Sequence, residues 1–288
     1  MAKINYICKK VKMKILVTND DGYEAGGISE LVEILRPYGD LTVVAPKRPQ
    51  SGMSMAVSMG LRPIAVKKLE EGPGLRRWYL DGTPASCIKY GLDNIFWPGR
   101  PDLVVSGINH GSNAATAALY SGTLGAAAEG ALNGIPSIGV SLDSFSRDAD
   151  FSLVRSLLPG ILDRLLPDMS RRRGTYYNIN FPGCGASGFK GIVPCHMGKA
   201  HWEREYRPYR SFLEEIGHEP DVEALGYLEA AAPGEEIYVM AGDFTDDGDN
   251  VYPSDHQLLE QGYVTVTPQN IDNTDYGELE RLGGMFGK

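Results

Sequence analysis

The feature that most constrains the fold is a short continuous apolar run at residues 15–18. A run of this length without polar alternation is typical of a parallel strand that is buried on both faces. After it, apolar residues recur at helical spacing between residues 28 and 35, and a second apolar run covers residues 41–45. A strand, a helix and a strand in this order form a βαβ unit, which implies a right-handed crossover and a parallel pair.

The same alternation continues to residue 182. Apolar patterns predict strands at 103–106, 138–141 and 177–181, helices at 124–132 and 151–165, a helix that begins at Thr83-Pro84, and irregular strands or a hairpin within 56–80. Beyond residue 183 the hydrophobic pattern changes, because 196–236 is polar and shows no sustained period. Residues 237–241 and 263–267 are plausible strands. We therefore predict an α/β core at 13–182 with a mostly parallel sheet flanked by helices. An N-terminal extension at 1–12 precedes it, and a β-containing C-terminal elaboration at 183–288 serves assembly.

Charge and composition narrow the class of protein. The formal net charge is −9 and the sequence pI is about 5.1, which argues against a broad nucleic-acid-binding face. No apolar run approaches the roughly 20 residues that span a membrane, and residues 1–12 lack the apolar core of a secretory signal. The four cysteines show no paired or zinc-binding spacing. These observations predict a cytoplasmic protein with reduced thiols, no membrane and no nucleic-acid polymer as partner.

Four oxygen-bearing side chains are predicted at the carboxyl ends of strands. Asp20 and Asp21 follow the first strand, Ser51 lies in the loop after the second, and Asn109 follows the strand at 103–106. Ligands of open parallel sheets bind beyond these strand ends, and hard cations such as Mg²⁺ or Mn²⁺ prefer oxygen ligands. The alternative for the Asp pair alone is a helix cap and a solvated turn residue.

A second motif, Ser121-Gly122-Thr123, precedes the alanine-rich helix at 124–132. Hydroxyls and free backbone N–H groups at a helix N-terminus attract phosphate, although ordinary capping by Ser or Thr explains the motif better when it is taken alone. His110 lies in the candidate loop after Asn109 and is a candidate for proton transfer, against the plainer interpretation of a neutral ring bonded to local backbone.

Neither G-x-G-x-x-G after the first strand nor a P-loop sequence is present, so the dinucleotide and P-loop fingerprints are missing. Four blocks instead follow one another along the chain: 13–22, Val44-Ala45-Pro46 with Arg48 and Ser51-Gly52, Ser106-Gly107-Ile108-Asn109 with Asn113, and Tyr120-Ser121-Gly122-Thr123. In this order and spacing the chain resembles the SurE survival-protein family of 5′/3′-nucleotidases over residues 13–182 and again at 262–268.

The resemblance implies a Rossmann-like core and one divalent cation, Mg²⁺ or Mn²⁺, per subunit. It further implies dimers or tetramers formed through C-terminal extensions and an exchanged hairpin. Carried over to this chain, the metal ligands are Asp20, Asp21, Ser51 and Asn109, and the phosphate position is lined by Asn113, Ser121, Gly122 and Thr123. Three departures stand out: no glycine lies between Asn113 and Tyr120, residues 196–236 match poorly, and residues 1–12 lie outside the family pattern.

The hypothesis that follows is metal-assisted hydrolysis of nucleoside 5′-monophosphates, with 3′-monophosphates as a further class, in which Asp20 or Asp21 orients the attacking water. Two alternatives share the clustered carboxylates. A deacetylase-like hydrolase would need a zinc-binding histidine with a partner at suitable spacing, which the sequence lacks. A receiver module would be much shorter and would need a separate phosphoacceptor Asp, a role that Asp102 fits badly because it precedes its strand.

Overall fold

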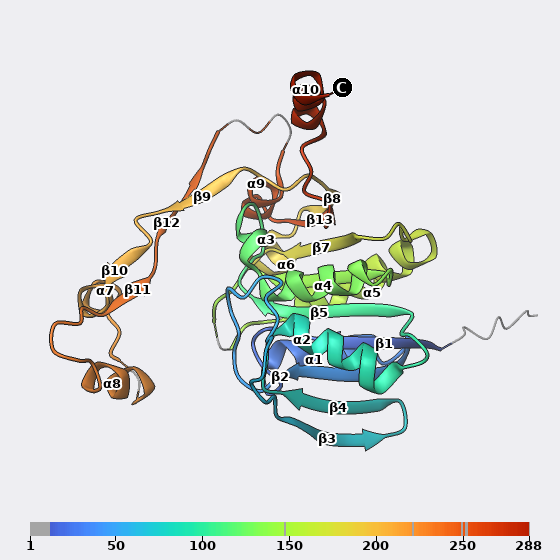
Figure 1. Cartoon of the computed structure of the whole chain (residues 1–288), viewed down its shortest axis with the longest axis horizontal. Coiled ribbons are helices and arrows are strands. Elements are labelled where there is room, and N and C mark those ends of the chain that lie inside the picture. The colour runs from blue at the N-terminus through green and yellow to red at the C-terminus, as the bar shows by residue number, and fades with distance from the viewer. Residues whose placement is uncertain (1–11, 147, 221, 249, 251–252, 288) are drawn as a thin grey trace, which may run out of the picture. The chain divides into compact units, whose positions relative to one another are not determined.

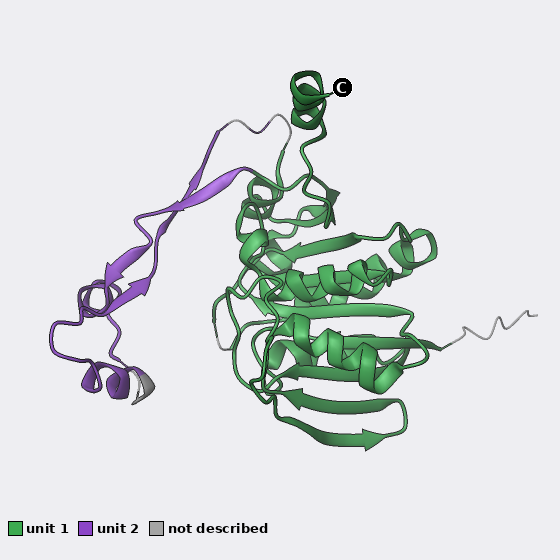
Figure 2. Cartoon of the chain, in the orientation of Figure 1, with its two compact units in different colours: residues 1–198, 252–288 green, residues 199–251 purple. Residues whose placement is uncertain are grey.

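The computed structural model describes residues 12–146, 148–220, 222–248, 250 and 253–287. The predicted N-terminal extension, apart from residue 12, lies outside these described residues. The chain divides into two compact units, one formed by residues 1–198 and 252–288 and the other by residues 199–251 (Figure 2).

The first unit contains an α/β sheet with its flanking helices (Figure 1). Its strands are β1 (Met13–Thr18), β2 (Gly39–Pro46), β3 (Val66–Gly72), β4 (Leu75–Leu80), β5 (Leu103–His110), β6 (Ser137–Leu142), β7 (Thr175–Phe181), β8 (Gly191–Pro194) and β13 (Tyr263–Asn270). Its helices are α1 (Gly26–Leu35), α2 (Pro84–Tyr90), α3 (Ala117–Tyr120), α4 (Gly122–Leu132), α5 (Ser152–Leu165), α6 (Gly185–Gly188), α9 (Asp255–Glu260) and α10 (Tyr276–Phe286), with a π-helical turn at Gly91–Phe96 and a 3₁₀ turn at Leu166–Asp168.

The strands of this unit are ordered β3-β4-β2-β1-β5-β6-β7-β13-β8. From β4 to β7 every neighbouring pair is parallel, whereas β3 and β13 run antiparallel to β4 and β7. The predicted mostly parallel, Rossmann-like α/β fold is therefore confirmed, and so is the hairpin within 56–80. Strand order reverses between β1 and β5, so the topological switch point lies at their carboxyl ends, where Thr18 pairs with Ser106.

Alternate side chains of β1 pack into two different hydrophobic clusters. Ile15 and Val17 pack in the larger cluster with residues of α1 and α5, whereas Leu16 packs on the opposite face with residues of α2 and α4. All three side chains are fully buried. The continuous apolar run follows from this arrangement, because a strand covered by helices on both faces has no solvent-facing position for a polar side chain.

Strand β5 runs four residues further than the sequence predicts, through Gly107 to His110. Its pairing with β6 shifts between Ser106 and Asn109, which is a bulge-like irregularity. Gly107 has φ +134°, and a Cβ there would lie 2.2 Å from the Val140 carbonyl oxygen. Gly107, which suggested the end of a strand, instead allows the neighbouring backbone of β6 to come close within a longer strand. Asn109 and His110 are the last two residues of that strand.

The second unit, the ribbon unit, is a long antiparallel ribbon of two arms, made of two successive strand pairs, with helices between the arms. Strand β9 (Ala200–Glu203) pairs with β12 (Asp243–Asp246), and β10 (Tyr206–Pro208) pairs with β11 (Tyr238–Met240). Helices α7 (Tyr209–Ile216) and α8 (Val222–Glu229) connect the two arms. The stretch without a sustained period thus consists of short elements, each too brief to show a repeat.

The division between the units differs from the predicted boundary at residue 183. Strands β8 and β13 continue the central sheet, because β13 pairs with β7 and β8 pairs with β13. Residues 252–287 consequently belong with the core, and only 199–251 forms a separate unit. A strand that returns to its sheet after more than eighty residues leaves no local signal of that pairing in the sequence.

Candidate functional site

The turn after β1 places two carboxylates at the switch point. The fully buried Asn19 donates from Nδ2 to the Gly22 carbonyl oxygen at 2.9 Å, which closes the turn around the Asp pair. Gly22 adopts φ +100°, a conformation that favours glycine. Asp20 points into the protein and is only 3% exposed, whereas the side chain of Asp21 is 19% exposed.

The N-terminus of α4 meets Asp20. Thr123 donates from Oγ1 to Asp20 Oδ1 at 2.6 Å, and a Cβ on Gly122 would lie 2.9 Å from the Asp20 Cβ. Burial raises the Asp20 pKa to about 6, against the lowering effect of the Thr123 hydrogen bond, and nearby Asp21 raises it further. A carboxylate desolvated in this way beside a second carboxylate favours a positive partner.

Asp21 pairs with His110, the last residue of β5. Its Oδ2 atom lies 3.2 Å from the His110 backbone nitrogen and 3.2 Å from ring Nδ1. The ring also packs edge-on against Phe151, with 5.5 Å between centroids. The expected bond from this ring to local backbone is not what the structure shows, since its partner is a carboxylate that follows another strand. The sequence signal for this pairing was that both residues lie at the carboxyl ends of their strands, His110 at the end of β5 and Asp21 after β1.

Asn109 near the end of β5 and Ser51 in the loop after β2 are the other two predicted donors. Asn109 donates from Nδ2 to the Gly111 carbonyl oxygen at 2.8 Å, so its Oδ1 is the atom left to accept or coordinate. The Gln50 backbone nitrogen donates to the Asp20 carbonyl oxygen at 2.7 Å, which ties the loop that carries the exposed Ser51 to the turn after β1. Sequence reasoning placed all four oxygen donors at strand ends, and the structure brings their elements to one edge of the sheet.

The predicted phosphate residues have partners of their own in this conformation. Ser121 caps α4, with its Oγ accepting from the Leu124 backbone nitrogen at 3.1 Å. Thr123 is committed to Asp20, a contact that sequence reasoning missed because Thr after Gly at a helix start looks like an ordinary cap. Asn113 donates from Nδ2 to Ser141 Oγ at 2.8 Å and is buried. Direct phosphate contact by these side chains stays a prediction.

The donor set fits a hard divalent cation. It combines two carboxylates with an amide oxygen and a hydroxyl, and one oxygen of each carboxylate is held by a side chain from another element. The Asn19 Oδ1 atom at this turn is also buried, and none of the residues that the structure describes hydrogen-bonds to it. Across the described residues no group of three or more His, Cys, Asp and Glu side chains is placed to hold a metal, so the histidine-bearing zinc site of a deacetylase is not found there.

Fold and site together define an α/β protein whose acidic, oxygen-lined site lies at a sheet switch point and faces a helix N-terminus. The profile of the family described as "Survival protein SurE" matches residues 15–204. The chain belongs to this family, which confirms the resemblance drawn from the four sequence blocks.

Curated relatives and a solved structure match nearly the whole chain. A protein from Bacteroides thetaiotaomicron named 5′-nucleotidase SurE is 38% identical over 277 residues, covering 95% of this chain and 96% of its own. A protein of the same name from Clostridium botulinum is 34% identical, covering 95% and 99%. The crystal structure of the SurE protein from Aquifex aeolicus superposes with a TM-score of 0.73 at 29% identity, covering 94% and 99%.

Among the described residues, each helix is too short or too polar to cross a bilayer.

Proposed function

We propose that this chain is a divalent-metal-dependent 5′-nucleotidase that hydrolyses nucleoside 5′-monophosphates, with 3′-monophosphates as a further substrate class. The observation that carries the proposal is the buried Asp20 carboxylate held between its neighbour Asp21 and the N-terminus of α4 at the switch point. The names of the curated relatives support the same activity.

Asp20, Asp21, Asn109 and Ser51 would hold one cation, Mg²⁺ or Mn²⁺, and their all-oxygen character suits either ion. When bound, the cation polarises a phosphoryl oxygen and offsets the negative charge that the Asp pair and the substrate bring together. Thr123 acts on this centre indirectly, because its hydroxyl fixes one oxygen of Asp20 and thereby orients the other.

The phosphate would lie against the start of α4. The first backbone N–H groups of a helix carry partial positive charge, and the close approach allowed by Gly122 brings this end against Asp20. Ser121 and Asn113 border the same position from the helix cap and from the loop before α3. These dipoles stabilise charge on the equatorial oxygens as the leaving group departs.

Asp21 is the residue that we assign to the attacking water. It is the more exposed carboxylate of the pair, and its Oδ2 is fixed by His110, so this contact sets the direction in which the carboxylate orients a water beside the cation. His110 holds Asp21 in place and faces Phe151 on its other side, which makes it a positioning residue.

We further propose a homodimer or homotetramer in the cytoplasm. The described cysteines Cys87, Cys184 and Cys195 are free thiols, as expected for a reducing compartment. The ribbon unit exposes large apolar side chains, which supports assembly through this region: Tyr206, Tyr227, Tyr238 and Met240.

Hydrolysis of a panel of compounds tests the proposed function, measured as release of phosphate from nucleotides and of acetate from acetylated amides. The panel contains 5′- and 3′-nucleoside monophosphates and acetylated amides, each with Mg²⁺, Mn²⁺, Zn²⁺ or chelator. Many turnovers of nucleotide with Mg²⁺ or Mn²⁺, and none with chelator, are expected. A single stable phosphorylation of the protein would indicate a receiver, and zinc-only amide cleavage would indicate a deacetylase. Either outcome would overturn the proposal.

A further inference from the structure

The loop between β5 and α3 contains a backbone conformation that needs support. Ala115 has φ +50°, in the left-handed region that L-residues with a Cβ seldom adopt, and it is fully buried. No glycine lies between Asn113 and Tyr120 to relieve this conformation. Contacts from outside the loop must therefore hold it, since a strained backbone persists only where its surroundings determine it.

On one side, the loop is tied to the sheet through Asn113. Its backbone nitrogen donates to Asn180 Oδ1 at 2.8 Å, and its Nδ2 donates to Ser141 Oγ at 2.8 Å. Its carbonyl oxygen accepts from Asn178 Nδ2 at 2.7 Å. All four side chains are buried, so the network fixes Asn113 but does not reach Ala115, two residues further on.

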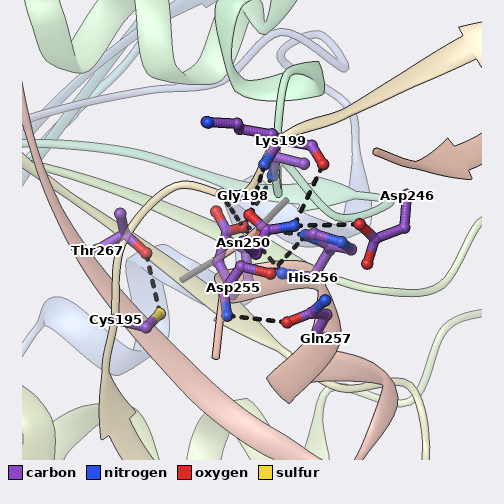
Figure 3. A network of polar contacts seen from close by, with 12 residues as sticks. Cys195, Gly198, Lys199, Asp246, Asn250, Asp255, His256, Gln257 and Thr267 are labelled. Carbon is purple, nitrogen blue, oxygen red and sulfur yellow. Dashed lines mark hydrogen bonds and ion pairs between the residues drawn. The ribbon is translucent and has the colours of Figure 1, made fainter. Parts of the chain in front are cut away.

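On the other side, the loop is tied to Asp255, the first residue of α9. Asp255 Oδ1 accepts from three backbone nitrogens: Ala115 at 3.0 Å, Gly198 at 2.9 Å and His256 at 2.8 Å. Figure 3 shows Asp255 with Gly198 and His256 around it. The side chain is fully buried, and charge-assisted bonds of this kind are stronger than neutral ones.

This contact joins distant parts of the chain. Asp255 lies 140 residues after Ala115, in the segment that returns to the core after the ribbon unit, and Gly198 is the last core residue before that unit. One carboxylate oxygen thus holds the loop between β5 and α3 together with the two core segments that lie directly before and after the ribbon unit.

We propose that Asp255 is a positioning residue for the phosphate-binding loop, which it holds in its strained conformation through the Ala115 N–H. The inference rests on the proposed function, because it assigns Asn113 and the start of α4 to the phosphate. Asp255 touches neither substrate nor cation. Its loss lets Ala115 relax to negative φ, which displaces the segment between Asn113 and the start of α4.

The Asp255→Ala variant tests the proposal. Since a displacement of about 1 Å at a positioning group can cost on the order of 100-fold in rate, kcat/KM for AMP should fall by about that factor. The inhibition constant of inorganic phosphate should rise in parallel, whereas the Kd of Mn²⁺ measured by calorimetry without substrate should stay within about twofold, because the Asp20–Asp21 turn is untouched.

A second substitution separates positioning from general loss of structure. Glycine adopts the left-handed conformation without the Cβ penalty, so Ala115→Gly in the Asp255→Ala background should recover roughly tenfold in kcat/KM and in phosphate inhibition. Asp255→Asn, which keeps Oδ1 as an acceptor, should fold and lose less than the alanine variant. Asp275→Ala is the matched control: Asp275 caps α10 in the same C-terminal segment, where its side chain accepts from the Glu278 backbone nitrogen and not from the loop, so wild-type kinetics are expected.

The outcomes distinguish this inference from the proposed function. Wild-type protein that does not hydrolyse AMP would overturn the proposed function itself. Wild-type protein that is active, with folded Asp255→Ala protein keeping wild-type kcat/KM and phosphate inhibition, would overturn only the role of Asp255. Equal losses in the Asp255→Ala variant and in the double variant that also carries Ala115→Gly would contradict positioning through Ala115.

Discussion

At the scale of single residues, the site depends on how its two carboxylates divide their oxygens. Asp20 Oδ1 is held by Thr123, and Asp21 Oδ2 is held by His110. Each carboxylate is thereby oriented by a neighbour that comes from a different element of the fold. Outer partners of this kind set the direction of a ligand and raise its effectiveness, so they affect function without touching the substrate.

Replacing Thr123 by valine should weaken the centre while preserving the fold. Valine keeps the branched shape but removes the hydroxyl that donates to Asp20, so Mn²⁺ affinity or AMP turnover should fall about tenfold to a hundredfold. Calorimetric Mn²⁺ titration and steady-state kinetics measure the effect, with Thr123→Ser, which keeps the hydroxyl, as the control. A valine variant with wild-type affinity and turnover would show that this bond does not matter.

Much of the site could be predicted from the sequence at this scale, because strand-end positions are visible in the apolar pattern. Asp20, Asp21 and Asn109 were found in this way. The role of Thr123 was not, since a hydroxyl at a helix start caps the helix in most proteins. Its bond to Asp20 spans 103 residues, and a pairing of that range depends on how α4 packs on the sheet.

At the scale of elements, α4 both presents its N-terminus to Asp20 and packs along α2. Glu129 lies on its buried side at 2% exposure, where Oε1 accepts from Lys89 Nζ and from Asn133 Nδ2, each at 2.8 Å. Lys89 comes from α2, so one ion pair fixes the two helices against each other. A buried charge of this kind destabilises the protein strongly when its partner is removed.

Lys89→Met should lower the free energy of unfolding by roughly 1–3 kcal/mol, since it leaves the buried Glu129 carboxylate with Asn133 alone. Urea denaturation measures the change. Lys68→Met, which removes an exposed pair with Glu71, is the matched control and should change stability by less than about 1 kcal/mol. Adding Glu129→Gln should recover part of the loss in the first variant. Equal effects of the two lysine substitutions would contradict this account of α4.

The elements of the fold differ in how well their own local sequence predicts them. The apolar run of β1 and the Thr83 cap of α2 are local signals, and both elements form where the sequence indicates. The longer course of β5 was not foreseen, because Gly107 resembles a strand end until the close Val140 carbonyl explains it. The placement of β13 beside β7 likewise depends on pairing between distant residues.

At the scale of the whole molecule, the ribbon unit presents apolar side chains that its own residues do not cover. Tyr206 and Met240 are register partners on β10 and β11, and they are 70% and 62% exposed. In α10 none of the described residues is buried, although the helix carries Leu279 and Phe286. Such surfaces are typical of chains that assemble with copies of themselves.

The chain should therefore have a mass in light scattering of two or four times its 31.3 kDa. Serine at both Tyr206 and Met240 should shift the population toward lower mass, because the paired apolar side chains are lost from the ribbon surface. Circular dichroism and Mn²⁺ affinity, which report on the core, should be unchanged in that variant. A wild-type protein that stays at 31.3 kDa at micromolar concentration would contradict the assembly proposal.

The central claim, a metal-dependent nucleotidase built on the turn after β1, is tested most directly by AMP hydrolysis with and without Asp21. Wild-type protein should release phosphate with Mn²⁺ or Mg²⁺, lose this activity in chelator and regain it when the cation is restored. Asp21→Asn, which keeps the size of the side chain, should fold like the wild type and lose at least about 100-fold in kcat. AMP turnover in chelator, or a folded Asp21→Asn protein with wild-type turnover, would contradict the account.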